Sequence, residues 1–254
     1  MTTPLSWLRI EIYQRMLDKL QPIRLQPDAI LLEPDFPSLT LNKFAKRFPG
    51  ARIDTIADSS LPANKLMQLK IRRSLHHLLT TGRWSSQICK NVEKQYGLIV
   101  SNLQLQQLNK PEEWLEMAHQ QIVEGGLLCF SYLGPDTGKE LRELGFSEAD
   151  HLQTLPGALD MHDIGDALVQ KGYSDPVMDM EYLHLEFDSN STCYRDSCAL
   201  GLLDPAVFPD RFSGTTVKKM TLEIVYGHAW VLGKNLSKSD GKTAYIRPDA
   251  IKRK

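Results

Sequence analysis

The sequence has few of the features that mark secreted, metal-binding or membrane proteins. Its four cysteines form no CxxC pair and are too sparse for a disulfide framework. No run approaches the ~18 apolar residues that a membrane helix needs, and no basic segment with an apolar core opens the chain. We therefore expect no metal site, no disulfide framework, no membrane association and a cytoplasmic location.

An excess of positive charge is also absent. The chain has 30 Lys and Arg residues against 31 Asp and Glu, for a formal net charge of -1. This balance predicts no general affinity for nucleic acid. At 254 residues with 42% hydrophobic content, the chain is long enough to bury a sizeable core.

Glycine is missing where a nucleotide-binding fold would use it most. Residues 28–60 read as a strand, a turn, a helix and a second strand. Such a unit usually binds a nucleoside through glycines in the first turn, where backbone N–H groups approach the ligand. Here the turn contains Pro34, Phe36, Pro37 and Ser38. Proline removes an N–H donor and phenylalanine fills space, so the pattern predicts the fold without the usual binding turn.

Strand and helix signals alternate along most of the chain. Strands are predicted near 29–33, 52–57, 97–101, 127–133, 177–187 and 221–231, with a brief one near 87–89. Helices are predicted at 5–20, 39–48, 61–82, 111–123, 137–144 and 161–172, the last closed by Gly172. This alternation predicts an α/β fold with a doubly wound, Rossmann-like sheet, mostly parallel. The two long late strands are expected to pair antiparallel at its edge.

We expect these elements to form a single domain over residues 1–254. Its predicted parts are a lead-in helix at 1–27, a core at 28–187, a cap or insertion at 188–220, a final strand at 221–233 and a basic tail at 234–254. The 188–220 segment has weak periodicity and many turn formers, which predicts a loose cap. The tail is expected to be partly disordered.

Several phrases of the sequence resemble the class I S-adenosylmethionine-dependent methyltransferases. They are RMLDKLQPIRLQP at 15–27, AKRFPGA at 45–51, SNLQLQQLNKPEEWL at 101–115, GGLLCFSYLGPDTGKELREL at 125–144, DMHDIGDALVQKGYSDPVMDMEYL at 160–183 and VYGHAW at 225–230. More narrowly, they are similar to the malonyl-acyl-carrier-protein O-methyltransferases of biotin synthesis. The resemblance implies S-adenosylmethionine as the cofactor and a malonyl thioester as the substrate.

The resemblance also locates the cofactor positions, and the residues there depart from the family pattern. The first motif of the family reads roughly ILDLGCGTG, where this chain has ILLEPDFPS from Ile30 to Ser38. The motif's aspartate falls on Leu32, and the acid that ends the second strand falls on Ala57. The positions implied for cofactor binding, or their neighbours, are Glu33, Asp58, Asn91 and Asn102.

The substrate side retains donor-rich residues inside family-like phrases. A malonyl carboxylate is already anionic at neutral pH, so its methylation needs positioning and no general base. The candidates for holding it are His162, Tyr226 and His228, with Arg195 outside those phrases. Each can equally be a structural hydrogen-bonding residue. No serine lies in a nucleophile-elbow context, so hydrolase chemistry is set aside.

The sequence leaves three functions open. The first is a methyltransferase-fold protein that has lost cofactor binding and serves as a binding or regulatory partner. The second is an active O-methyltransferase acting on a malonyl thioester with an atypical cofactor loop, and the third is a relative that methylates a protein side chain.

The partners considered are an acidic acyl carrier protein and an active paralogue. Basic clusters for a carrier are Lys65, Lys70, Arg72 and Arg73, and Arg247, Lys252, Arg253 and Lys254 in the tail. Either cluster can also be an ordinary solvated surface.

Overall fold

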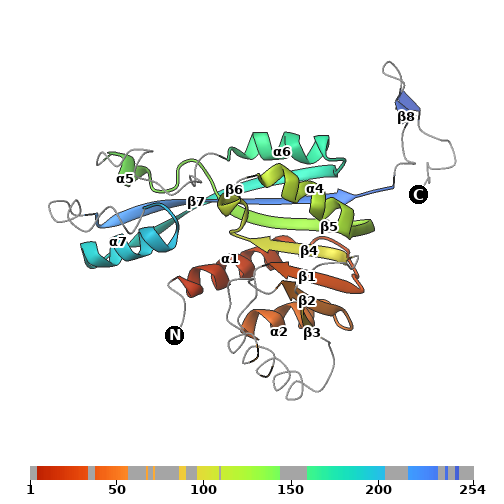
Figure 1. The fold of residues 1–254 in the computed structure, drawn as a ribbon, viewed down its shortest axis with the longest axis horizontal. Helices are drawn as coiled ribbons and strands as arrows, with labels where there is room; N and C mark the ends of the chain where they lie inside the picture. Colours follow the sequence, from red (N-terminus) through yellow and green to blue (C-terminus); the bar gives the residue numbers. More distant parts are fainter. Residues whose placement is uncertain are drawn as a thin grey trace.

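In the part of the chain that the structure describes, seven strands form one mixed sheet in the order β3-β2-β1-β4-β5-β7-β6 (Figure 1). The computed structural model describes residues 5–33, 38–56, 67, 71, 86–89, 96–108, 110–143, 159–203, 217–233, 238–239 and 244–245. The strands are β1 (Ala29–Glu33), β2 (Arg52–Ile56), β3 (Ser86–Cys89), β4 (Tyr96–Asn102), β5 (Ile122–Leu133), β6 (Ser174–Glu186) and β7 (Lys219–Val231). Strands β1 to β5 are parallel, and β7 is antiparallel to both β5 and β6. The predicted mostly parallel sheet with antiparallel late strands is confirmed.

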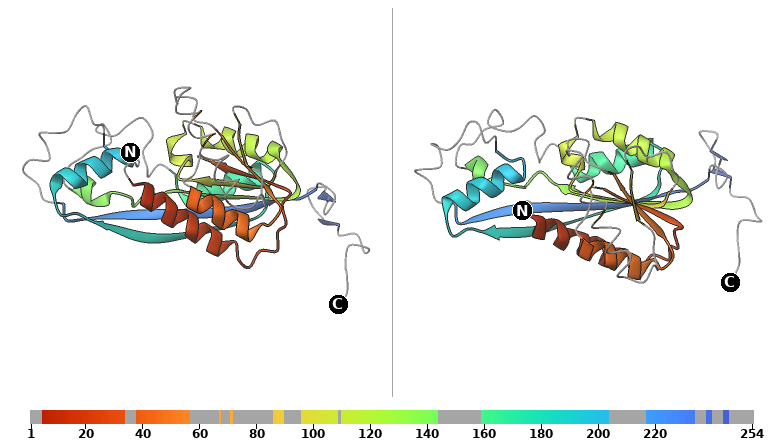
Figure 2. Two further views of the ribbon diagram at one scale, coloured as in Figure 1. Left: turned by 90° about the horizontal axis from the view of Figure 1, so that it is seen from below. Right: turned by 60° about the horizontal axis from the view of Figure 1, so that its bottom comes forward.

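Helices cover both faces of this sheet (Figure 2). They are α1 (Ser6–Lys19), α2 (Ser38–Arg47), η1 (Leu105–Gln107), α4 (Pro111–Gln121), α5 (Lys139–Glu143), α6 (Met161–Gln170) and α7 (Asn190–Ala199); β8 (Lys238–Ser239) and β9 (Ala244–Tyr245) form a separate ribbon. Helices α1, α2 and α7 pack on one face, and α4 and α6 pack on the other. None of the described helices is both long enough and apolar enough to cross a membrane.

The side chains of β5 alternate between two hydrophobic cores, one on each face of the sheet. Leu127 and Cys129 belong to the cluster shared with α1 and α2, whereas Leu128 and Phe130 belong to the cluster under α4 and α6. Successive strand residues point to opposite faces, so a strand covered on both faces is apolar throughout. Gly227 of β7 pairs with Phe130, and a Cβ there would lie 2.2 Å from Phe130 Cζ. Only glycine therefore fits at this position.

Two local signals delimit α6, and the second of them, Gly172, was predicted from the sequence. The Asp160 side chain accepts a hydrogen bond of 2.7 Å from the backbone N–H of His162, which caps the amino end of the helix. Gly172 follows the helix with φ +89, a conformation that glycine adopts without strain. Helix α6 therefore ends where the glycine predicts.

Two predicted boundaries shift in the structure. The helix predicted over 111–123 ends at Gln121, and β5 begins at Ile122 instead of near 127. Ile122 and Val123 are apolar residues that suit either element, and β-branched side chains favour a strand. Gly125, with φ +80, then bends the strand locally. The helix predicted at 137–144 begins only at Lys139.

The segment predicted as a loose cap at 188–220 contains a helix that the sequence analysis did not predict. Helix α7 begins after Ser189, whose hydroxyl accepts a hydrogen bond from the backbone N–H of Thr192. Its weak amphipathic pattern arises because few of its side chains are buried, with Cys193 fully enclosed. The following Leu202 and Leu203 are also buried in the core on the α1 side.

Candidate functional site

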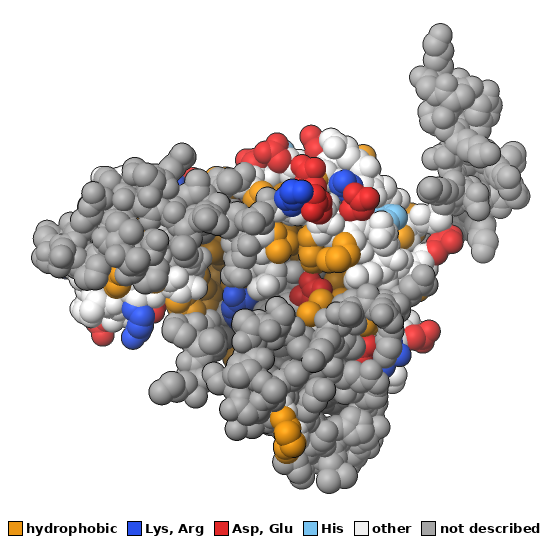
Figure 3. Space-filling view, in the orientation of Figure 1, with side chains coloured by type: hydrophobic (Ala, Val, Ile, Leu, Met, Phe, Trp, Pro, Cys, Tyr) orange, Lys and Arg blue, Asp and Glu red, His pale blue; other side chains and the backbone are white. Residues whose placement is uncertain are grey.

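The carboxyl ends of β1 and β4 are the first candidate site. The chain leaves β1 toward β2 and β3 on one side and returns to β4 on the other, so the strand order reverses between β1 and β4. Ligands of open α/β sheets bind in the crevice at such a switch point. Figure 3 shows acidic side-chain atoms set among hydrophobic ones in a hollow over these strand ends.

Glu33 ends β1 with a buried carboxyl group. Only 9% of the residue is exposed, and Trp114 Nε1 donates a hydrogen bond of 3.2 Å to its Oε2. Among the described residues no Lys, Arg or His forms an ion pair with it. Burial without a compensating charge raises the pKa of Glu33 to about 7. The carboxyl therefore holds its proton to a higher pH than an ordinary glutamate does.

Next to Glu33, Ser101 lies on the neighbouring strand. The two residues are register partners in the β1–β4 pair, so their side chains share one face of the sheet. Ser101 is fully buried, and its Oγ has no hydrogen-bond partner among the described residues. On the other side of β1, the Tyr13 hydroxyl donates a hydrogen bond of 2.9 Å to the Glu33 backbone carbonyl.

Asn102 ends β4, and its side chain is used to hold α1 in place. Its Nδ2 donates to the Arg9 carbonyl at 2.9 Å, and its Oδ1 accepts from Ser131 Oγ at 3.0 Å. Arg9 Nη1 donates in return to the Asn102 carbonyl at 3.2 Å. Burial lowers the pKa of Arg9, but its ordinary value lies so high that the guanidinium stays charged. This predicted cofactor residue therefore joins α1, β4 and β5.

The remaining positions implied for cofactor binding offer no described polar side chain. Leu32, which stands at the motif's aspartate, is fully buried in the apolar cluster under α1 and α2. Asp58 and Asn91 lie outside the described residues, as does the turn at 34–37.

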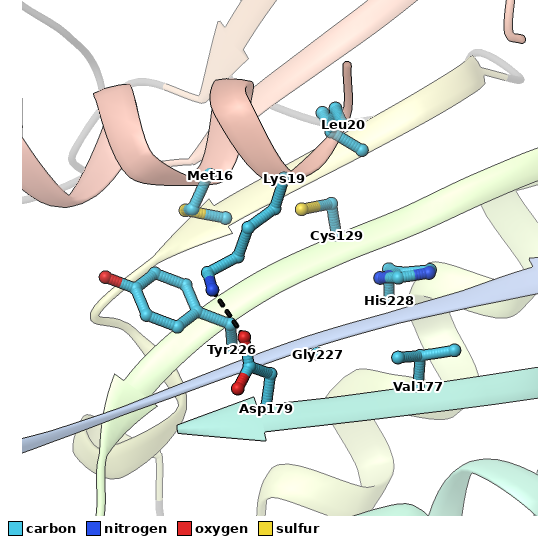
Figure 4. A pocket seen from close by; sticks show the side chains of 9 residues that line it. All are labelled: Met16, Lys19, Leu20, Cys129, Val177, Asp179, Tyr226, Gly227 and His228. Atoms are coloured by element: carbon cyan, nitrogen blue, oxygen red, sulfur yellow. Dashed lines mark hydrogen bonds and ion pairs between the residues drawn. The ribbon is translucent and has the colours of Figure 1, made fainter. Parts of the chain in front are cut away.

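Tyr226 and His228 line a second candidate site on the sheet face (Figure 4). This site is a cavity of about 210 Å³ between the carboxyl-terminal half of α1 and strands β5, β6 and β7. Its lining residues are Met16, Lys19, Leu20, Cys129, Val177, Asp179, Tyr226, Gly227 and His228. Residues 226 and 228 of one strand point to the same face, which brings these two predicted residues together.

Most polar groups around this cavity are already paired. Lys19 forms an ion pair with Asp179, drawn as a dashed line in Figure 4. The Tyr226 hydroxyl donates to Glu181 Oε1 at 2.6 Å, and Arg15 Nη1 reaches the other oxygen of Glu181 at 2.5 Å. Burial, followed by this hydrogen bond, raises the pKa of Tyr226. Tyr226 thus links β7 to Glu181 of β6, and Arg15 links the same carboxylate to α1.

His162 lies apart from both sites. It belongs to the first turn of α6, on the sheet face opposite to α1. Its side chain is 78% exposed, and Nδ1 lies 2.7 Å from Asp160 Oδ1. The structure therefore brings together two of the three predicted substrate residues and leaves His162 on the helix cap. Arg195 is on α7, with its Nε 3.1 Å from Asp196 Oδ1.

No family model matches the chain, but curated relatives do. It is 33% identical over 249 residues to a malonyl-[acyl-carrier protein] O-methyltransferase of Gallionella capsiferriformans, which covers 88% of this chain and 83% of the relative. It is 30% identical to the protein of the same name from a Methylovorus species, over 96% of this chain and 89% of the relative. The chain belongs to the malonyl-[acyl-carrier protein] O-methyltransferase family.

Solved structures agree with the fold of this family. A putative methyltransferase from Bacillus halodurans superposes with a TM-score of 0.58 at 10% identity, and the match covers 88% of this chain and 100% of that structure. A phosphoethanolamine N-methyltransferase of Haemonchus contortus gives 0.53 at 12% identity, covering 88% and 53%. At such identities the likeness concerns the fold alone.

The family resemblance found in the sequence is thus confirmed. Several residues of the two sites were not identified from the sequence. Arg9 and Trp114, which flank the strand ends, look in the sequence like an ordinary charged and an ordinary core position of amphipathic helices. Lys19 and Asp179 pair across 160 positions of sequence, a contact that no local pattern contains. Among the described residues, no cluster of His, Cys, Asp and Glu could hold a metal.

Proposed function

We propose that this member of the O-methyltransferase family has lost S-adenosylmethionine binding and serves as a non-catalytic binding or regulatory partner. The observation that carries the proposal is Leu32, an apolar residue fully buried under α1 and α2 where the family motif has an aspartate. A leucine there has no polar group to offer to the following turn or to a ligand.

The residues around Leu32 support the same conclusion. The turn PDFPS after Glu33 contains two prolines and no glycine, so it has fewer N–H donors and less room than the family's turn. The Asn102 carboxamide is committed to Arg9 and Ser131. One lost hydrogen bond to a charged group costs ~1.5–3 kcal/mol, and a micromolar affinity amounts to ~8 kcal/mol. Several such losses remove most of that affinity.

Calorimetric titration with S-adenosylmethionine tests the proposal. We expect no saturable heat at ~100 μM ligand, where a site worth ~5.5 kcal/mol would be half filled. The Gallionella relative, titrated in the same buffer, is the positive control. As a matched variant, the chain with Leu32→Asp, Pro34→Gly, Phe36→Gly and Ser38→Gly is expected to gain a titration signal. Saturable binding by the unmodified protein would overturn the proposal.

The alternative is an active O-methyltransferase that acts on a malonyl thioester. It is favoured by the match to relatives of that name over 88% to 96% of this chain. The carboxylate substrate needs no general base, so a weakly bound cofactor and a positioned substrate would suffice. Formation of a methyl ester from a malonyl thioester and S-adenosylmethionine, followed by mass spectrometry, would establish this function.

The partner that we propose is an acyl carrier protein or an active paralogue. The basic clusters expected to meet an acidic carrier fall outside the described residues, so their sequence alone supports this part. Binding to a malonyl-loaded carrier should be weak and should fall as salt rises, since the Debye length is ~10 Å at 0.1 M. Reversal of Arg72 and Arg73 to Glu should weaken it in a low-salt titration, and unchanged binding would remove the support for this surface.

A further inference from the structure

The cavity on the sheet face is separate from the carboxyl ends of β1 and β4. Its centre is the rung of Cys129, His228 and Val177, which are register partners on β5, β7 and β6. Asn102 at the end of β4 pairs with Ser131, further along β5. The cavity therefore opens beneath β5, β7 and β6, against α1, and a ligand in it would not occupy the crevice of the switch point.

The charges around the cavity cancel. Lys19 and Asp179 neutralise each other at its rim, with side chains 35% and 56% exposed. Burial raises the pKa of the Cys129 thiol to about 12, so this group is an uncharged sulfur. Because the lining residues carry no net charge, the cavity favours neither an anion nor a cation.

Among the described residues, His228 is the polar lining group without a hydrogen-bond partner. It is half-buried, and none of the described residues forms a hydrogen bond with its imidazole. Burial lowers its pKa, so the ring is neutral at neutral pH, with one nitrogen as a donor and the other as an acceptor. An uncharged ligand with one hydrogen-bonding group would complete this site.

Shape and surface chemistry favour a flat ring. Two sulfur atoms, of Met16 and Cys129, face the cavity together with the Tyr226 ring. Sulfur atoms make favourable contacts with aromatic rings. The volume of about 210 Å³ exceeds the ~150 Å³ that accommodates benzene in an engineered cavity and lies below the ~300 Å³ typical of drug-sized ligands. We propose that this cavity binds a small uncharged heteroaromatic compound, held by a hydrogen bond to His228.

Such a ligand would be linked to the strand ends through α1. Met16 and Lys19 line the cavity, and the same helix donates hydrogen bonds from Arg9 to Asn102 and from Tyr13 to Glu33. A compound that packs against Met16 stabilises the docked position of this helix, because binding favours the state that contains the complete site.

Indole is the probe, because it is flat, uncharged and carries one N–H donor. We would follow the methionine methyl groups by NMR in the full-length protein. Met16 reports on the cavity, while Met117, 46% exposed on α4, reports on non-specific association. Saturable movement of the Met16 signal with a Kd of about 1 mM or tighter, with Met117 unmoved, is expected. Parallel, unsaturated movement of both signals would overturn the proposal.

Variants separate the hydrogen bond from simple apolar packing. His228→Phe keeps a ring but removes both nitrogens, and should weaken indole binding about tenfold, as expected for one lost hydrogen bond. His162→Phe is the matched control and should leave the affinity unchanged. Val177→Trp fills the cavity from an exposed position and should abolish binding. If His228→Phe binds indole as well as the unmodified chain does, the assigned role of His228 is wrong.

A charge series keeps the test decisive if the His228 variant does not fold. Tryptamine is cationic and indole-3-acetate is anionic, with nearly the same ring. Both should bind the unmodified protein more weakly than indole, because the lining has no net charge to compensate either group. Tighter binding of either ion than of indole would overturn the uncharged class.

Discussion

The carboxyl ends of β1 and β4 and the cavity beneath β5, β7 and β6 are built in opposite ways. At the strand ends, the Asn102 side chain hydrogen-bonds within the protein, and the buried Glu33 has no ion-pair partner among the described residues. In the cavity, Lys19 and Asp179 are paired, and the His228 imidazole has no hydrogen bond to any residue in the described part of the chain. The comparison shows that the polar side chains of the two regions differ in how many of their hydrogen bonds are made within the described part of the protein.

The largest effect is expected at Asn102. Replacement by Ala removes the hydrogen bonds to Arg9 and Ser131 and leaves buried groups without partners, so the free energy of unfolding should fall by about 2–4 kcal/mol. Urea denaturation measures it, with half-exposed Gln104→Ala as the control. A loss no larger than the control's would mean that the Asn102 carboxamide is free for a ligand, and would break the comparison.

Glu33→Gln should stabilise the protein in a pH-dependent way. Burial raises the pKa of Glu33 from 4.5 to about 7. Below pH 4.5 the carboxyl is protonated in both the folded and the unfolded state, so it costs the native state no stability. Stability is then lost as the pH rises through about 7. Gln stays neutral throughout. The difference in unfolding free energy between variant and unmodified protein should grow from near zero at about pH 4.5 to at most about 3 kcal/mol at about pH 8.

Denaturation curves for both proteins across this pH range isolate the Glu33 carboxyl, since all other groups titrate alike. A difference that is constant with pH would show that the carboxyl is compensated by a charge, contrary to its described surroundings.

A smaller effect is expected at the rim of the cavity. Tyr226→Phe removes the hydroxyl that donates to Glu181 at 2.6 Å, while Arg15 keeps its own contact with that carboxylate. The unfolding free energy should fall by about 1 kcal/mol. Indole binding should persist, because the ring remains. Loss of indole binding in this variant would show that the hydroxyl belongs to the site and would sharpen its chemistry.

The smallest effect is expected at His162. The side chain is largely exposed and touches only the helix cap, so replacement by Ala should change the unfolding free energy by no more than about 0.5 kcal/mol. Asp160→Ala is the contrasting variant, because it removes the cap itself and should cost about 1 kcal/mol. Thermal melting of both variants makes the comparison; a large loss for His162→Ala would reveal a role that neither site contains.

The sequence by itself determined the fold class, most strand positions and the family. These features depend on local signals: apolar runs, the alternation of strand and helix patterns, and Gly172 at the end of α6. Such signals act through neighbouring residues and do not depend on the rest of the chain. It also determined that the turn after β1 has no glycine. It failed at Ile122, because apolar β-branched residues suit two elements. It also did not predict α7, because a short helix with few buried side chains has little periodicity.

Only the tertiary structure decided what the candidate residues do. Tyr226 and His228 share a cavity with Lys19 because α1 lies across β5, β7 and β6, whereas His162 faces away on the other side of the sheet. Asn102 became a structural link because Arg9 and Ser131 reach it from distant positions. The pKa of Glu33 likewise depends on burial, which raises it, and on the Trp114 hydrogen bond, which acts in the opposite direction. Solvent exclusion and partner choice come from packing between segments, and a one-dimensional pattern does not contain them.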